Sequence, residues 1–164
     1  MKRLFLLCFL VISSAQLFAQ DEVTTFILVR HAEKSKDDPR DPSLSEAGVK
    51  RAAALNAMLG QADIAALYSS PYKRTKSTVK PIADAKGLEI NIYDPRSAAF
   101  LEDIMKAHRG KTIVISGHSN TTPSVVNALI GKDQFKQLSE SDFSKIFIVS
   151  VTEIGKGTAT VLTY

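Results

Sequence analysis

Cysteine is almost absent from this chain of 164 residues, which contains only Cys8. Cys8 lies in an N-terminal segment with a basic start, a short apolar run and then small residues. This order is typical of a secretory signal peptide, which is removed from the mature protein. We therefore expect residues 1–20 to be a signal peptide and the protein to be exported, periplasmic or extracellular. The sequence leaves open three residues after which cleavage would occur, namely Ala15, Ala19 and Gln20.

Without Cys8, the mature chain would have no thiol for a disulfide, a zinc site or a cysteine nucleophile. A lipid anchor on Cys8 would need a small residue before the cysteine, and Leu7 is not small. The chain also lacks an apolar run of about 20 residues, the length that a helix needs to cross a bilayer. We therefore expect no stable membrane anchor.

A strong excess of charge of one sign is lacking as well. The formal net charge is +4, and it falls to +2 without Lys2 and Arg3, since no acid precedes Asp21. Acids and bases are interspersed, which does not favour nucleic acid as a partner. No internal repeat or low-complexity segment is visible. Residues 21–164 therefore predict a single compact domain with a sizeable core.

β-Branched apolar runs alternate with helical patterns along this domain. Strands are predicted at residues 23–29, 64–68, 88–93 and 112–116, with a terminal hairpin at 145–152 and 158–164. Helices are predicted near residues 45–60, 71–85, 98–107 and 122–130. Pro81 is expected to kink the second helix. Alternating strands and helices predict an α/β fold, a three-layer α/β/α sandwich with a mainly parallel sheet and a C-terminal antiparallel hairpin.

Two histidines, His31 and His118, directly follow predicted strands. Ligands of open α/β sheets bind outside the carboxyl ends of the strands. Arg30 precedes His31, and Arg74 falls in the first turn of a predicted helix, where guanidinium donors and the helix dipole both favour an anion. Each residue taken singly could be a solvated charge or a loop cap, but together they predict a phosphate site. His108, in a helix tail, is interpreted as a surface residue.

Four segments resemble the motifs of the histidine phosphatase superfamily, the phosphoglycerate mutase-like enzymes. They are RHAE at residues 30–33, LSEAG at 44–48 followed by RA at 51–52, SSPYKRT at 69–75 and SGHSN at 116–120. The segments occur in the family's order and span nearly the whole domain. The absence of a large inserted cap is similar to the short branch of this superfamily, and an open site would admit a bulky substrate.

The resemblance implies a metal-independent phosphoric monoester hydrolase without a cofactor. In it, His31 is the nucleophile that becomes a phosphohistidine, while Arg30, Arg74 and His118 bind the phosphoryl group. A neutral imidazole can attack phosphorus, and two arginines compensate the charge on the phosphoryl oxygens. An ordinary histidine pKa of about 6.5 predicts best activity at mildly acidic to neutral pH. Asn120, just before a helix, is a further candidate for phosphate binding.

A metal ion held by His31, Glu33 and His118 is the competing interpretation, but the arginines would repel a cation.

The general acid is the least defined role. Asp94 follows the third predicted strand at the correct sheet edge, whereas Glu33 is close to the nucleophile but could instead pair with Lys34 or Arg51. Glu102 and Asp103 lie in a helical pattern and are expected to be solvated.

The predicted substrate is an exported small phosphomonoester, such as a sugar phosphate, an inositol phosphate or the phosphate of an envelope glycan. Mutase activity and phosphohistidine signalling are cytoplasmic reactions, so the expected export counts against both. Two alternatives remain open. One is a non-catalytic phosphate-binding module, and the other is a phosphohistidine phosphatase-like protein that acts on a phosphoprotein.

Overall fold

The computed structural model describes residues 22–97 and 99–164, so the expected signal peptide at residues 1–20 lies outside the described residues. Strands and helices alternate until the C-terminal hairpin. The strands are β1 (Thr24–Arg30), β2 (Ile64–Ser69), β3 (Ile90–Ile92), β4 (Thr112–Gly117), β5 (Lys145–Val151) and β6 (Thr158–Thr163). The helices are α1 (Glu46–Leu59), α2 (Lys73–Lys86), α3 (Phe100–Ala107) and α4 (Thr121–Ile130).

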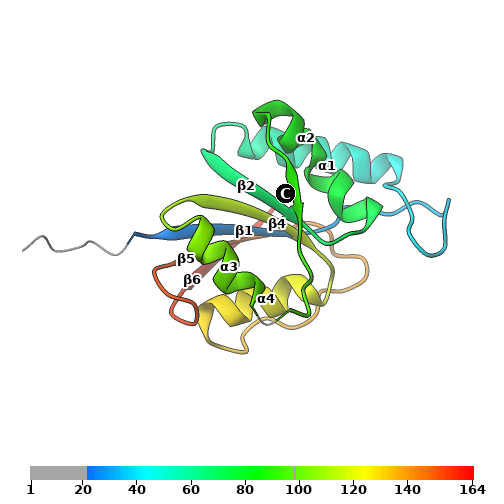
Figure 1. Ribbon diagram of the computed structural model, residues 1–164. Coiled ribbons are helices and arrows are strands. Elements are labelled where there is room, and N and C mark those ends of the chain that lie inside the picture. Colours follow the sequence, from blue (N-terminus) through cyan, green and yellow to red (C-terminus); the bar gives the residue numbers. More distant parts are fainter. Residues whose placement is uncertain (1–21, 98) are drawn as a thin grey trace, which may run out of the picture.

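All six strands form one sheet in the order β3-β2-β4-β1-β5-β6. The pairs among β1 to β4 are parallel, while β5 is antiparallel to both β1 and β6. Helices cover both faces of this sheet, α1 and α2 on one face and α3 and α4 on the other (Figure 1). The predicted α/β sandwich with its C-terminal hairpin is therefore confirmed.

The alternating side chains of β1 supply both halves of the core. Phe26 and Leu28 belong to the apolar cluster that contains residues of α3 and α4, whereas Ile27 and Val29 belong to the cluster under α1 and α2. All four are at most 5% exposed. A strand buried on both faces is what a continuous apolar run produces in a parallel sheet.

Helix α2 contains Pro81, the residue that is expected to kink it. The helix continues past this proline to Lys86 and ends at Gly87, which adopts the left-handed conformation with φ of 65°. Val79 and Ile82, on either side of Pro81, are fully buried in the apolar cluster. This packing offsets the backbone hydrogen bond that a proline removes.

The sheet register brings three strand ends together. Arg30 of β1 lies opposite Gly117 of β4, and Ser69 of β2 lies opposite Ser116. Beyond these ends, the His31 amide donates to the Gly117 carbonyl at 2.9 Å. Segments far apart in sequence thus leave the sheet side by side. Among the described residues, no helix has the length and apolar character that a membrane crossing requires.

Candidate active site

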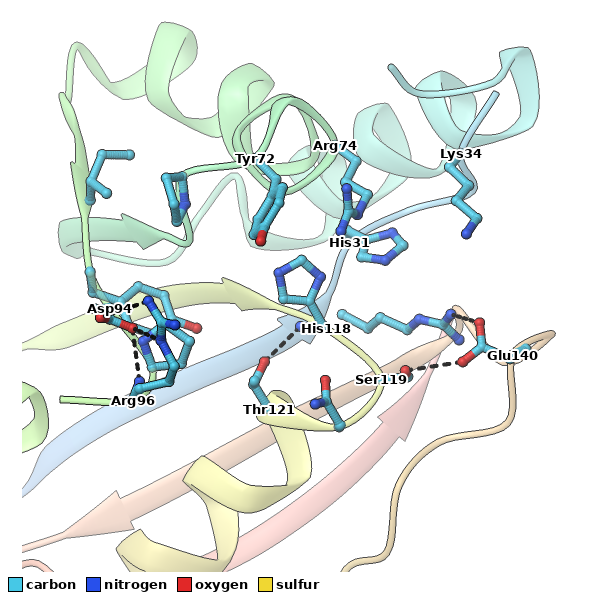
Figure 2. Close-up of a pocket in the computed structure, with 16 residues that line it drawn as sticks. His31, Lys34, Tyr72, Arg74, Asp94, Arg96, His118, Ser119, Thr121 and Glu140 are labelled. Carbon is cyan, nitrogen blue, oxygen red and sulfur yellow. Dashed lines mark hydrogen bonds and ion pairs between the residues drawn. The ribbon is translucent and has the colours of Figure 1, made fainter. Parts of the chain in front are cut away.

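A cavity of about 820 Å³ opens at these strand ends (Figure 2). It contains all four residues that the sequence placed at this edge, Arg30, His31, Arg74 and His118. The other lining residues are Lys34, Pro71, Tyr72, Ile92, Tyr93, Asp94, Pro95, Arg96, Ser119, Asn120, Thr121 and Glu140. Cationic and imidazole groups from three separate segments therefore converge on one space.

His31 stands directly after β1 and is 5% exposed. Its Nδ1 donates to the Ala32 carbonyl at 2.8 Å, because a carbonyl oxygen can only accept. Burial lowers the pKa of His31 to about 4, and the positive charges of Arg30 and Arg74 act in the same direction. The ring is therefore neutral near pH 7, with its proton on Nδ1 and its lone pair on Nε2.

His118 follows β4, and its ring centroid lies 5.4 Å from that of His31. Its Nε2 is 2.9 Å from the Ser70 hydroxyl, which donates to the Thr75 hydroxyl at 3.0 Å. Because Ser70 donates its hydroxyl proton to Thr75, the Ser70 oxygen can only accept a hydrogen bond from His118. The proton of the neutral His118 ring is therefore on Nε2, and the lone pair is on Nδ1. Burial, with the charges of Arg74 and Arg30, lowers the pKa of His118 to about 4.

Arg30 is 2% exposed and connects the pocket to the loop between α4 and β5. Its Nη1 donates to the carbonyls of Ser139 and Asp142 at 2.7 and 3.0 Å. Its Nη2 pairs with Glu140 at 3.3 Å, while its buried Nε has no hydrogen-bond partner among the described residues. A buried donor without a partner is costly, so Nε is a natural contact for an anion.

Arg74 lies in the first turn of α2, where the sequence placed it. Its guanidinium is 4.4 Å from the Tyr72 ring centroid, and its Nη1 is 3.7 Å from Asp41. The same carboxylate accepts from the Lys73 amide at 2.9 Å and so caps the helix. Asn120 also lines the cavity, at the exposed start of α4.

The candidate acids are placed very differently from one another. Glu33 does not line the cavity, since its carboxylate accepts three hydrogen bonds from Arg51, which also lowers the pKa of Glu33. The structure thus gives Glu33 a role in tying the loop to α1. Asp94 does line the cavity, but hydrogen bonds from Arg96 lower its pKa and favour the charged form, which cannot donate a proton.

Glu140 is a pocket residue that sequence reasoning did not identify. It lies in a loop without regular secondary structure, and no motif or strand end marks it. Its Oε1 accepts from the Ser119 hydroxyl at 3.2 Å, opposite the Arg30 contact of Oε2. Among the described residues, Asp94 and Glu140 are the only carboxylates that line the cavity.

The remaining sequence candidates lie outside the cavity. Glu102 and Asp103 are exposed on α3, as expected. His108, interpreted as a surface residue, is partly buried, with its Nε2 3.0 Å from the Tyr68 hydroxyl. In the described part of the chain, no three His, Cys, Asp or Glu side chains are grouped so that they could hold a metal ion.

Comparison with known proteins adds family evidence to this geometry. A family model described as the histidine phosphatase superfamily (branch 1) matches residues 26–95, the segment that contains Arg30, His31 and Arg74. Phosphoserine phosphatase 1 of Hydrogenobacter thermophilus is 29% identical, in a match that covers 67% of this chain and 78% of that protein.

Two solved structures share the fold at low sequence identity. A mycobacterial glucosyl-3-phosphoglycerate phosphatase is 13% identical, with a TM-score of 0.70 over 86% of this chain and 99% of that one. The protein histidine phosphatase SixA, solved with tungstate, is 18% identical, with a TM-score of 0.70 over 85% of this chain and 96% of that one. The matched family model, the phosphoserine phosphatase relative and this shared fold together support the resemblance of the chain to the histidine phosphatase superfamily.

Proposed function

We propose that this protein is a phosphomonoesterase that acts through a phosphohistidine intermediate on His31. The observation that carries the proposal is the hydrogen bond from His31 Nδ1 to the Ala32 carbonyl at 2.8 Å. It holds the ring in the tautomer whose Nε2 has a free lone pair. The pKa of about 4 keeps that lone pair unprotonated at neutral pH.

The reaction would proceed in two displacements. First, His31 Nε2 attacks phosphorus, the ester P–O bond breaks and the leaving oxygen takes a proton from solvent. A water molecule then attacks phosphorus and returns one proton to solvent, the P–N bond breaks, and inorganic phosphate leaves with the Nε2 lone pair restored. The covalent intermediate divides one difficult displacement into two easier ones. Arg30, Arg74 and His118 lie around the same cavity, where they can compensate charge on the phosphoryl oxygens.

The proposed reaction is independent of metal ions. The two guanidinium groups stay charged at any working pH and supply the positive charge that a bound cation provides in other phosphatases. Turnover should then persist in a chelator, and vanadate should inhibit it as an analogue of the phosphoryl group.

We further propose that the protein is exported and that its substrate is a small phosphomonoester. The leader-like order of residues 1–20 supports export. The names of two relatives, a phosphoserine phosphatase and a glucosyl-3-phosphoglycerate phosphatase, support a small phosphorylated substrate. The likeness to SixA supports the second candidate, a phosphohistidine on a protein.

The decisive experiment incubates purified protein with p-nitrophenyl phosphate and chelator, then quenches the reaction to trap the phosphoenzyme. The expected result is metal-independent release, with the phosphoryl group on His31, and loss of both in His31→Ala. Most of the turnover surviving in His31→Ala would overturn the nucleophile assignment. Phosphate binding without any release, in a folded protein, would favour the non-catalytic binding module.

A further inference from the structure

We infer that the alcohol half of the substrate binds an apolar wall beside the phosphate pocket and carries an aromatic or aliphatic group. This inference rests on the proposed function and names the substrate class for the same site. The wall consists of Pro71, Tyr72, Ile92 and Pro95, all of which line the cavity that contains His31. We call these four residues the apolar wall.

Strand pairing brings the apolar wall together. Ile92 at the end of β3 lies opposite Ser69 at the end of β2. The chain continues from Ser69 through Ser70 to Pro71 and Tyr72, and from Ile92 to Pro95. Figure 2 shows Tyr72 between Arg74 and Asp94, so the wall begins beside the arginine that we assign to the phosphoryl group. The rest of an ester whose phosphoryl group binds the arginines would lie in the same cavity, which the wall lines.

Two large apolar side chains of the wall are exposed to solvent. Tyr72 is 40% exposed and Ile92 is 54% exposed. The other exposed large hydrophobic residues among residues 22–97 and 99–164 do not line the cavity, namely Val23, Val49, Met58, Val161 and Leu162. Exposed apolar surface inside a concave site is typical of a ligand contact, since its burial releases about 25 cal/mol per Å².

The Tyr72 ring is held in place by two contacts on its own side of the pocket. Its centroid lies 5.1 Å from that of His118, at an interplanar angle of 85°, and the Arg74 guanidinium lies 4.4 Å from it. A ring that is already oriented loses little conformational entropy when a ligand packs against it. The wall is therefore a prepared surface for a flat or aliphatic group.

The charges around the wall argue against a second anionic group on the substrate. Arg96 is the cation nearest in sequence to Ile92 and Pro95, and its guanidinium hydrogen-bonds to both carboxylate oxygens of Asp94. An added carboxylate or phosphate would have to compete with Asp94 for this partner. An aryl or alkyl group would instead bury apolar surface without displacing any ion pair.

The test measures binding of three phosphonates, which cannot be hydrolysed, to the full folded chain by titration calorimetry. Methylphosphonate has only the phosphate-like group, benzylphosphonate adds an aromatic ring, and phosphonoacetate adds a second anion. We expect benzylphosphonate to bind at least about tenfold more tightly than methylphosphonate, from burial of the ring against the wall. Phosphonoacetate should gain no such advantage.

Ile92→Thr keeps the β-branch and removes apolar surface, so it should reduce the preference for benzylphosphonate by about threefold. Val161→Thr, on the exposed strand β6, is the matched control and should leave the preference intact. Equal binding of benzylphosphonate and methylphosphonate, an unchanged preference in Ile92→Thr, or a preference for phosphonoacetate would each overturn the inference. If none of the three phosphonates bound, the proposed phosphate site itself would be overturned. This outcome distinguishes failure of the proposed function from failure of the apolar-wall inference.

Discussion

Glu140 Oε2 accepts a hydrogen bond from Arg30 Nη2 at 3.3 Å, so a carboxylate of the protein pairs with the guanidinium group that our proposal assigns to the phosphoryl group. The same arginine binds two backbone carbonyls of the loop that carries Glu140. A single guanidinium therefore organises this loop and the phosphate pocket together. An incoming anion must share Arg30 with Glu140 or displace it.

Replacement of Glu140 by glutamine should strengthen anion binding. The change removes a negative charge from the pocket and keeps the shape of the side chain. Since the carboxylate is 74% exposed, solvent screens its charge, and we expect vanadate to bind only about threefold more tightly. Calorimetry at low and high salt would measure the effect, which should shrink at high salt. Glu46→Gln, an exposed change in α1, should have no effect, and weaker binding in Glu140→Gln would show that Glu140 positions Arg30.

Anion binding should be accompanied by proton uptake. The hydrogen bonds of Ser70 leave the lone pair of neutral His118 on Nδ1, which can donate to a phosphoryl oxygen only when it is protonated. A bound dianion raises the pKa of a nearby imidazole from its value of about 4. Sulfate, which stays a dianion, should therefore bind more tightly at pH 5 than at pH 7. Calorimetry in buffers of different ionisation enthalpy would count the protons, and His118→Gln should take up fewer.

Stability should decline on the acid side of neutrality. The pKa values of His31 and His118 are about 4 in the folded protein and about 6.5 in an unfolded chain. Between these values the unfolded state binds more protons, so the free energy of unfolding falls as the pH drops from about 6.5 toward 4. Urea unfolding across this range would show the slope. A His31→Gln variant with an undiminished slope would contradict the lowered pKa.

The ion pair between Glu33 and Arg51 should contribute to stability. It is partly buried, with side chains 23% and 25% exposed, and Arg51 also donates to the Tyr164 carbonyl at 3.0 Å. Arg51→Met would leave the Glu33 carboxylate without its partner and should cost about 2 kcal/mol in urea unfolding. The control is Lys50→Met, which breaks the exposed pair with Glu46 and should change stability by less than about 0.5 kcal/mol. Equal effects would refute the assigned role.

Gly48 and Gly60 provide a matched test of close packing. A Cβ at Gly48 would lie 2.2 Å from the Glu33 carbonyl oxygen, whereas one at Gly60 would lie 3.4 Å from the Asn56 carbonyl oxygen, an ordinary contact. Gly48→Ala should therefore shift the loop after His31, lowering both phosphatase activity and stability, the latter by about 2 kcal/mol. Gly60→Ala should be neutral or slightly stabilising, because its φ of −56° suits alanine. A fully active Gly48→Ala variant would show that the loop after His31 can shift without loss of activity.

The parallel part of the fold was accessible from sequence because local pattern and topology agree. The end of each apolar run marks the end of a strand, and parallel strands place their carboxyl ends at one edge of the sheet. Arg30, His31, Arg74 and His118 could therefore be grouped from the sequence alone. Glu140 could not be found in this way. Its position depends on Arg30 reaching the carbonyls of Ser139 and Asp142, a contact between residues more than 100 positions apart.

The partner of Glu33 was also beyond sequence reasoning. Lys34 and Arg51 are equally available to Glu33 by sequence, and only the packing of α1 against the loop selects Arg51. Tertiary packing therefore decides between two partners that are locally equivalent. Helix α2, in contrast, was predicted from sequence, and the burial of Val79 and Ile82 stabilises it on either side of Pro81.

The hydroxyl of Thr78 joins the backbone beside His31, the proposed nucleophile, to the helix that carries Arg74. It accepts from the Ala32 amide at 2.9 Å and donates to the Arg74 carbonyl at 2.8 Å. The backbone next to His31 and the first turns of α2 are thus hydrogen-bonded to the same side chain. A change that loosens the first turns of α2 should therefore reduce turnover before the protein as a whole unfolds.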